Sequence, residues 1–257
     1  MQKTVIVIPC FNESRRLTPC EFHKAVTGNL WLHFLFVDDG SKDGTGEILE
    51  DMCRSFSAQM GWIRLERNSG KAEAVRRGFL VAFKKDAAQI GYWDADLATS
   101  LDVIPGFCEI LEAPGIKVVM GSRVRLLGRR IERRPLRHYL GRIFATCASM
   151  LIKLPVYDTQ CGAKIFRNTP ELRRVFSTPF NVRWIFDVEI LARFLMEERT
   201  SRTTPLIESA VEYPLERWKE IAGSKIRAVD FLVALLELGR IFVFLRFPKK
   251  AETASTP

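Results

Sequence analysis

One stretch of the sequence passes from an apolar run through an acidic turn toward a helix: Phe34-Leu35-Phe36-Val37-Asp38-Asp39-Gly40-Ser41-Lys42-Asp43-Gly44-Thr45. Residues 34–37 have the composition of a buried strand, and residues 45–56 have the periodicity of a helix. The segment Asp43–Thr45 can cap that helix, and the glycines permit a tight turn. Capping does not explain why Asp38 and Asp39 stand together at a strand end, so both are candidate ligand-binding residues.

The same alternation of strand and helix extends to both sides of this stretch. Apolar patterning predicts strands at 5–8, 34–37, 62–65, 90–93, 118–120, 163–166 and 207–213, and helices at 15–27, 45–56, 71–83, 101–111, 136–154 and 186–197. Strands separated by helices imply a mostly parallel sheet with helices on both faces. The expected fold is therefore α/β and Rossmann-like, as one domain over residues 1–225.

Polar side chains cluster where the predicted strands end. Asn12 and Glu13 follow the first strand, Asn68 follows the third, and Asp94 and Asp96 follow the fourth. Ligands of such sheets bind beyond the carboxyl ends of the strands. Two carboxylates two residues apart offer hard oxygen ligands to Mg²⁺ or Mn²⁺, which would bridge them to a diphosphate. A metal there would neutralise the charge that develops on a departing nucleoside diphosphate.

Four of these motifs carry a family resemblance: Pro9-x-x-Asn12-Glu13, Asp38-Asp39-Gly40-Ser41-x-Asp43-Gly44-Thr45, Asn68-x-Gly70-Lys71 and Asp94-x-Asp96. In this order they resemble the family-2 inverting glycosyltransferases with the GT-A fold, over roughly residues 4 to 225. The resemblance implies a nucleotide site and a catalytic metal site. Its nucleotide residues would be Pro9, Glu13, Asp38, Asp39, Lys71 and Asp94, and its metal residues Asp94 and Asp96. Lys71 opens a predicted helix, where it can meet a phosphate or an acidic partner.

Motifs in the second half look like the subgroup that glycosylates polyprenyl phosphates: Gly121-Ser122-Arg123, Asp158-Thr159-Gln160-Cys161-Gly162, Trp184-x-Phe186-Asp187-x-Glu189 and Trp218-x-x-x-x-Gly223-Ser224-Lys225. They are closer to dolichyl-phosphate glucosyltransferases than to mannose-phosphate-dolichol synthases. The resemblance implies that Asp158 and Gln160 line the sugar and acceptor region, and that Asp187 positions the acceptor or acts as a base. UDP-glucose is the favoured donor, with another UDP-sugar or GDP-mannose as alternatives.

A basic block accounts for much of the net charge of +9. Between residues 123 and 142 the chain carries eight arginines and a single acid, Glu132. Guanidinium groups grip phosphate oxygens bidentately, so the block indicates an anionic partner. Its alternative is a solvated surface. For the acceptor phosphate, Arg123 is the first candidate, followed by Arg134, Arg137 and the more distant Lys225. A nucleic-acid-binding role is disfavoured because the block lacks interleaved aromatic residues and leaves the acidic strand ends unexplained.

Residues 226–247 form a last apolar segment, long enough to span a bilayer but interrupted by charges. On a helical wheel Arg227, Asp230, Glu237 and Arg240 gather into one stripe, which favours an amphipathic helix lying in the membrane interface. The alternative is a helix that docks on the domain. Residues 248–257 are predicted to be a disordered tail. A peripheral protein at the cytoplasmic face of a membrane is expected, and its oligomeric state is left open.

Two further functions stay open on the sequence alone. A family-2 transferase could instead act on a soluble or polysaccharide acceptor, which would require a well-placed base such as Asp187. A non-catalytic nucleotide-sugar binder is also possible, but the intact pair Asp94 and Asp96 argues against it. The six cysteines show no metal-binding spacing, so they are expected to be reduced thiols that mostly pack in the core.

Overall fold

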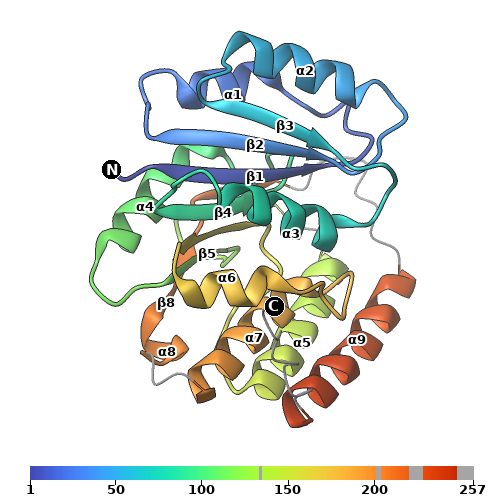
Figure 1. Ribbon diagram of the computed structural model, residues 1–257. Helices are drawn as coiled ribbons and strands as arrows, with labels where there is room; N and C mark the ends of the chain where they lie inside the picture. Colours follow the sequence, from blue (N-terminus) through green and yellow to red (C-terminus); the bar gives the residue numbers. More distant parts are fainter. Residues whose placement is uncertain (133–134, 201–203, 220–227, 248–257) are drawn as a thin grey trace, which may run out of the picture.

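The computed structural model describes residues 1–132, 135–200, 204–219 and 228–247, and it describes the side chains of these residues except at 135–138 and 228–232. A seven-stranded sheet in the order β3-β2-β1-β4-β7-β5-β8 crosses the molecule (Figure 1). Its strands are β1 (Thr4–Cys10), β2 (Leu32–Asp38), β3 (Met60–Arg64), β4 (Gln89–Trp93), β5 (Val118–Ser122), β7 (Ala163–Arg167) and β8 (Ala210–Pro214). β6 (Arg130–Glu132) and β9 (Arg217–Lys219) pair separately.

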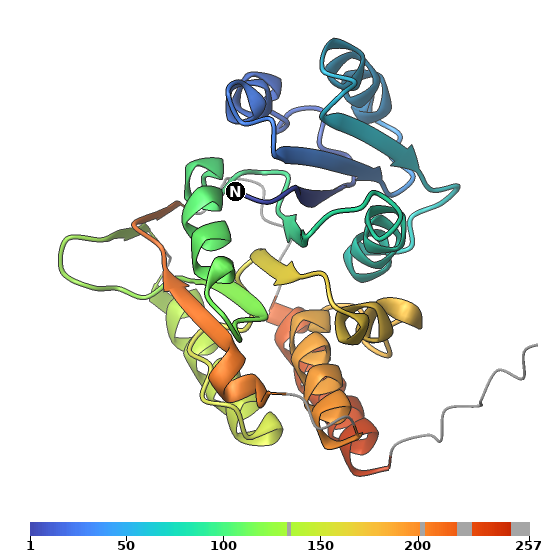
Figure 2. The same cartoon turned by 60° about the vertical axis from the view of Figure 1, so that its left-hand side comes forward.

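Helices cover both faces of the sheet. They are α1 (Pro19–Val26), α2 (Thr45–Ser55), α3 (Lys71–Ala82), α4 (Ile104–Glu112), α5 (Pro135–Ile152), α6 (Pro170–Ser177), α7 (Phe186–Thr200), α8 (Leu206–Ser209) and α9 (Ala228–Arg246), with a 3₁₀ turn at Leu101–Val103. Figure 2 shows α3 and α4 on opposite sides of β1 and β4. This arrangement confirms the predicted α/β fold.

Alternate side chains of each central strand enter different cores. In β1, Val5 and Val7 join the core that α3, α6 and α7 cover, whereas Ile6 and Ile8 join the core that α1, α2 and α4 cover. Because both faces are buried, the strand is an unbroken apolar run, as expected for parallel α/β sheets.

The directions of the strands place several of the connecting loops at one edge of the sheet. β1 pairs in parallel with β2 and β4, and β2 with β3, so their carboxyl ends lie at one edge. β7 runs antiparallel to both β4 and β5, while β8 is parallel to β5. The loop before β7 therefore arrives at the same edge as the loop after β4.

Some predicted elements differ from the structure. The helix predicted at 15–27 begins at Pro19, because the residues before it form a turn in which the amides of Arg16 and Leu17 donate to the carbonyl of Glu13. The strand predicted at 207–213 is divided into α8 and β8. Helix α6 was not predicted, although the Thr169 side chain caps it in the usual way.

Helix α9 packs on the domain, against α5 and α7. Ala234, Leu238 and Ile241 are buried there and belong to the same core as the sheet. The helical wheel groups Glu237 with three other charged residues in one stripe, and in the structure the Glu237 side chain faces the domain and is only 4% exposed. Three backbone amides pair with this carboxylate, which offsets its desolvation. The predicted boundary at residue 225 and the predicted tail lie outside the described residues.

Candidate active site

The loops that follow β1 and β2 are tied into one unit. The amide of Asn12 donates to Ser41 Oγ at 3.0 Å, and Asn12 Oδ1 accepts from the amide of Lys42 at 3.0 Å. The amide of Glu13 donates to Thr45 Oγ1 at 2.9 Å. Glu13 is nearly buried and its carboxylate accepts from Arg16. Pro9 is partly exposed at the end of β1. The predicted nucleotide residues of the first motif thus lie beside those of the second.

Asp38 shapes the turn after β2. Its side chain has no exposed surface. Asp38 Oδ1 accepts from the amide of Ser41 at 2.9 Å, and Oδ2 lies 3.4 Å from Arg64 Nε. Asp38 therefore supports the turn from within, and its contact with the nucleotide stays a prediction.

Asp39 holds the start of α3. Its two carboxylate oxygens accept from the amides of Ser69 and Gly70 at 2.7 and 2.8 Å. Burial raises the pKa of Asp39, although these two donors oppose the shift. At the neighbouring Gly40, where φ is +70°, a Cβ would lie 2.7 Å from the carbonyl carbon of Arg67. The turn after β2 and the start of α3 are therefore in close contact, and Asp39 bridges them.

Asp94 and Asp96 follow β4 at the same edge. Asp94 Oδ1 lies 2.6 Å from Lys71 Nζ, and the two side chains are 37% and 39% exposed. Asp96 Oδ1 accepts from the amide of Ala98 at 3.1 Å. Burial, and then the charge of Asp94, raise the pKa of Asp96. Burial lowers the pKa of Lys71, but Asp94 and then Asp187 raise it above its usual value. Lys71 has met an acidic partner, one of the two outcomes that the sequence predicted.

The backbone before β7 supports Asp94 from below. The amide of Asp94 donates to the carbonyl of Gly162 at 3.0 Å. A Cβ at Gly162 would lie 1.9 Å from Asp94 Oδ2, so any larger residue would displace this carboxylate. This close approach explains why a glycine occupies the last position of the Thr-Gln-Cys-Gly motif.

The chemistry of the carboxylate pair fits a hard divalent cation. Within the described ranges no group of three or more His, Cys, Asp or Glu side chains is arranged to hold a metal ion. The chain therefore offers the two carboxylates of Asp94 and Asp96, and the remaining ligands would come from a diphosphate and water, as is usual for Mg²⁺. The pKa of Asp96 is raised first by burial and then by the charge of Asp94, and a cation would relieve the repulsion between these like charges.

A buried ionic cluster lies under this site. Lys164, on β7, has no exposed surface, and its Nζ donates to the carbonyls of Thr159 and Cys161 at 3.1 and 2.6 Å and to the carboxylate of Asp187. The Tyr92 hydroxyl donates to the same carboxylate. Asp187 is 3% exposed and its carboxylate is held by two partners, and its role in positioning the acceptor or acting as a base stays a prediction. A lone lysine in an apolar strand was the sequence signal for Lys164.

Arg123 and Asp158 pair with each other. Arg123 Nε and Nη2 donate to the two carboxylate oxygens of Asp158 at 2.6 and 2.7 Å, and the amide of Arg123 donates at 3.1 Å. The guanidinium also lies 5.2 Å from the ring centroid of Trp218. The Arg123 and Asp158 side chains are only 11% and 8% exposed. The amide of Gln160 donates to Asp158 at 3.2 Å, so the predicted acceptor residues do lie together. The arginine chosen first for the acceptor phosphate, however, is engaged within the protein.

Other members of the basic block also have internal partners. Arg129 lies 2.6 Å from Glu216, and Arg142 donates to the carbonyl of Tyr157 at 2.6 Å while stacking over its ring. Arg134 and Lys225 lie outside the described residues. The backbone of Arg137 belongs to α5, but its side chain is not described.

The sequence prediction missed Arg183. This residue is exposed, and its guanidinium lies over Gly70, with Nη2 3.4 Å from the position of a Cβ there. Its charge lowers the pKa of the neighbouring Asp39. Its place directly before the Trp184 motif was the available signal.

Comparison with known proteins assigns the family. Residues 5–177 match the model of glycosyl transferase family 2. The chain is 31% identical over 259 residues to the human dolichyl-phosphate beta-glucosyltransferase, covering 94% of this chain and 74% of the relative. It is 29% identical over 257 residues to a dolichyl-phosphate beta-glucosyltransferase of Trichomonas vaginalis, covering 95% and 72%.

Solved structures share the fold at low identity. Glucosyl-3-phosphoglycerate synthase from Mycobacterium tuberculosis, in complex with UDP, superposes with a TM-score of 0.62 at 15% identity, covering 97% of this chain and 82% of that one. A mannosyltransferase from Pyrobaculum calidifontis, in complex with GDP-Man and Mn²⁺, superposes with a TM-score of 0.56 at 13% identity, covering 96% and 70%. The architecture is therefore GT-A, and this chain belongs to glycosyl transferase family 2 and is a glycosyltransferase.

Proposed function

We propose that this glycosyltransferase moves a hexose from a nucleoside diphosphate sugar, with UDP-glucose favoured, to a polyprenyl phosphate such as dolichyl or undecaprenyl phosphate. The transfer inverts the anomeric centre and takes place at the cytoplasmic face of a membrane, on which the protein sits peripherally. One observation carries the proposal: the carboxylates of Asp94 and Asp96 stand beside Lys71 at the sheet edge of a chain whose curated relatives are dolichyl-phosphate glucosyltransferases.

The reaction is a single displacement. An oxygen of the acceptor phosphate bonds to the anomeric carbon as the bond from that carbon to the diphosphate oxygen breaks, and the electron pair leaves with the nucleoside diphosphate. Because a lipid monophosphate is already an anion near neutral pH, the nucleophile needs positioning more than deprotonation. The buried and doubly partnered carboxylate of Asp187 agrees with a reaction that requires no base there.

The donor half of the site is built from the edge of the sheet. Asp94 and Asp96 would hold Mg²⁺ or Mn²⁺, which when bound supplies positive charge to the departing diphosphate. Lys71 would bring a further positive charge to the same position from the start of α3, where backbone amides also favour an anion. The loop unit of Pro9, Glu13 and the Asp38 turn supports the nucleotide.

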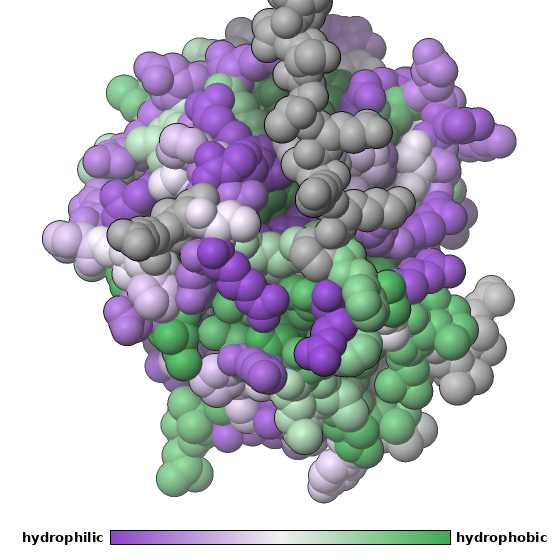
Figure 3. Space-filling view, turned by 60° about the horizontal axis from the view of Figure 1, so that its bottom comes forward, coloured by the Kyte–Doolittle hydropathy of each residue, from purple (hydrophilic) through white to green (hydrophobic). Residues whose placement is uncertain are grey.

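An apolar surface supports membrane contact. α9 exposes Leu235, Leu236, Phe242 and Val243, Phe247 is exposed directly after it, and α5 exposes Tyr139, Ile143 and Met150. Figure 3 shows hydrophobic side chains gathered on this face. Arg240 and Arg246 are exposed on the same helix and would meet anionic headgroups. Among the described residues no helix is long and apolar enough to cross a bilayer, so the proposed contact is interfacial.

A panel of donors and acceptors tests the proposal. Purified protein is incubated with UDP-glucose, another UDP-sugar or GDP-mannose, with Mn²⁺, in vesicles that contain dolichyl or undecaprenyl phosphate. The lipid fraction is then analysed by mass spectrometry. We expect a polyprenyl phosphate hexose, formed fastest from UDP-glucose. Faster transfer from GDP-mannose would instead make the enzyme a mannosyltransferase, and transfer only to water-soluble acceptors would refute the lipid acceptor.

A further inference from the structure

We propose that Arg183 binds a phosphate group of a substrate and that Glu237, on the apolar helix α9, positions it. Arg183 and Glu237 come from segments far apart in the sequence, and they meet where the loop between α6 and α7 passes under α9. The inference rests on the proposed function only in identifying the phosphate as that of the donor or that of the lipid acceptor.

Glu237 grips the backbone around Arg183. Its Oε1 accepts from the amide of Arg183 at 2.9 Å, and its Oε2 accepts from the amides of Trp184 and Ile185 at 3.0 Å each. These amides belong to the segment that leads into α7, where backbone donors lack intrahelical partners. A buried carboxylate with three such donors has one strongly favoured position, so it fixes the backbone from which the Arg183 side chain extends.

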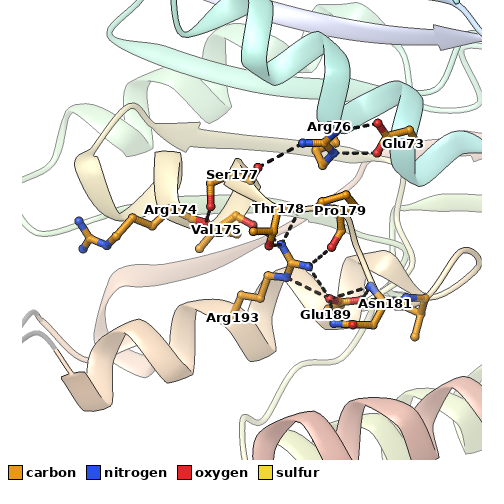
Figure 4. A network of polar contacts seen from close by, with 11 residues as sticks. Glu73, Arg76, Arg174, Val175, Ser177, Thr178, Pro179, Asn181, Glu189 and Arg193 are labelled. Atoms are coloured by element: carbon orange, nitrogen blue, oxygen red, sulfur yellow. Dashed lines mark hydrogen bonds and ion pairs between the residues drawn. The ribbon is translucent and has the colours of Figure 1, made fainter. Parts of the chain in front are cut away.

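The other half of the same loop is held by α7 itself. Figure 4 shows Arg193 and Glu189 reaching from this helix to the loop. Glu189 accepts from the amides of Asn181 and Val182, and Arg193 donates to the carbonyls of Val175, Thr178 and Pro179. The loop therefore has two separate anchors. The α7 anchor is internal to the domain, whereas the Glu237 anchor ties the Arg183 end to the helix with the exposed apolar face.

Arg183 reaches the donor half of the site. Its guanidinium lies over Gly70, whose amide donates to Asp39, and the next residue is Lys71, whose Nζ contacts Asp94. Within the part of the chain that the structure describes, no carboxylate lies within ion-pair distance of Arg183. An exposed guanidinium at the N-terminus of α3, one residue from the lysine that contacts Asp94, has the chemistry of a phosphate ligand.

Arg183→Ala and Glu237→Gln, alone and together, test both parts of the inference. UDP affinity is measured calorimetrically with Mn²⁺ and without lipid, and the KM for dolichyl phosphate is measured in vesicles. We expect Arg183→Ala to weaken one of these by roughly 10- to 100-fold, as for loss of a charge-assisted hydrogen bond, with an unchanged Tm. Weaker UDP binding assigns the donor phosphate, and a raised lipid KM alone assigns the acceptor phosphate. No change in either would overturn the role of Arg183.

The double variant separates positioning from stability. If Glu237 acts through Arg183, then Glu237→Gln alone should weaken the same binding constant, UDP affinity or lipid KM, that Arg183→Ala weakens. In the Arg183→Ala background, Glu237→Gln should weaken that constant by less than about a further threefold. Glu198→Gln is the matched control, because Glu198 also accepts a backbone amide, that of Leu206, but far along α7. Its effect should be small and equal in both backgrounds. If Glu237→Gln does not fold, Glu237→Asp, which retracts the carboxylate by one methylene, replaces it.

Equal losses from the Glu237 variant with and without Arg183 would overturn the positioning role. Failure of the proposed function would look different. If the wild type makes no polyprenyl phosphate hexose, the KM for dolichyl phosphate cannot be measured. The calorimetric UDP affinity still decides whether Arg183 binds a phosphate. If Asp96→Asn abolishes lipid product while Arg183→Ala changes neither constant, the proposed function stands and this inference fails.

Discussion

Two segments each bring an arginine to the edge of the sheet where the candidate site lies, and the two arginines have opposite surroundings. After β5, Arg123 is bonded to both oxygens of Asp158, lies beside Trp218 and is largely buried. Before α7, Arg183 is exposed over the start of α3. The first arginine holds two parts of the protein together, while the second has hydrogen-bonding capacity available for a ligand.

A pattern of charges along the sequence does not show which of those charges have partners elsewhere in the fold. The basic block marked Arg123 as a phosphate ligand, because eight arginines within twenty residues face a single acid in the sequence. Its partner, Asp158, comes from a distant loop, and a buried pair of this kind satisfies the charge internally. Arg183 lies outside the block, so nothing in the local charge density indicated it.

The largest expected difference is in stability. Arg123→Met removes the guanidinium that donates to both oxygens of the buried Asp158 carboxylate, and it should lower the free energy of unfolding by about 3–5 kcal/mol. Arg183→Met removes an exposed side chain and should change it by less than about 0.5 kcal/mol. Urea denaturation followed by circular dichroism measures both. A stable Arg123→Met protein with a raised KM for dolichyl phosphate would return Arg123 to the acceptor site.

A second expected difference concerns the membrane, since α9 holds the Arg183 segment. Leu235→Gln with Leu236→Gln removes apolar surface from the outward face, and sedimentation with anionic vesicles should show partitioning roughly 10-fold or more weaker. Ile207→Gln is the control, because Ile207 is also exposed but lies on α8. Equal effects of both changes would argue against a defined membrane face. Deleting α9 is a poorer test, because Leu238 and Ile241 belong to the core.

The smallest expected effect is on the reactivity of the Cys161 thiol, which lies in the same loop as Asp158. Burial raises the pKa of the Cys161 thiol to about 11, although Arg123 opposes the shift. The thiolate therefore forms only near that pH, and a disulfide reagent at pH 8 should spare Cys161 while modifying the exposed Cys20 and Cys147. Mass spectrometry of the labelled peptides measures this. Rapid modification of Cys161 in the folded protein would mean that the loop opens and that Arg123 is less confined than its contacts indicate.

Much of the fold could be predicted, because its signals are local. The apolar runs of β1 and β2 and the polar residues at their ends placed the sheet and one edge of it correctly. The sequence predicted where the candidate site lies on the sheet, but it did not predict which groups its side chains contact. Asp39 follows a strand, but its hydrogen bonds to Ser69 and Gly70 depend on how the turn packs on α3.

The second half was less predictable for the same physical reason. The direction in which Glu237 points cannot be read from a helical wheel, because a wheel shows which residues share a face but not what that face contacts. Here the carboxylate is buried against backbone amides that have no partner within their helix. β6 and β9 are only three residues each and have no periodicity to detect. The direction of Glu237 and the pairing of β6 with β9 both depend on contacts between residues far apart in the sequence, and not on local composition.

We propose that Asp94 and Asp96 form the metal and diphosphate centre of the transferase. Calorimetric titration of UDP with and without Mn²⁺ tests it most directly in three proteins: the wild type, Asp96→Asn, and Asp102→Asn, which changes an exposed carboxylate. We predict that Mn²⁺ tightens UDP binding about 10-fold or more in the wild type and in Asp102→Asn, and that Asp96→Asn loses this increment. An equal increment in Asp96→Asn, or UDP affinity in the wild type that does not change with Mn²⁺, would show that this carboxylate pair is not the metal centre.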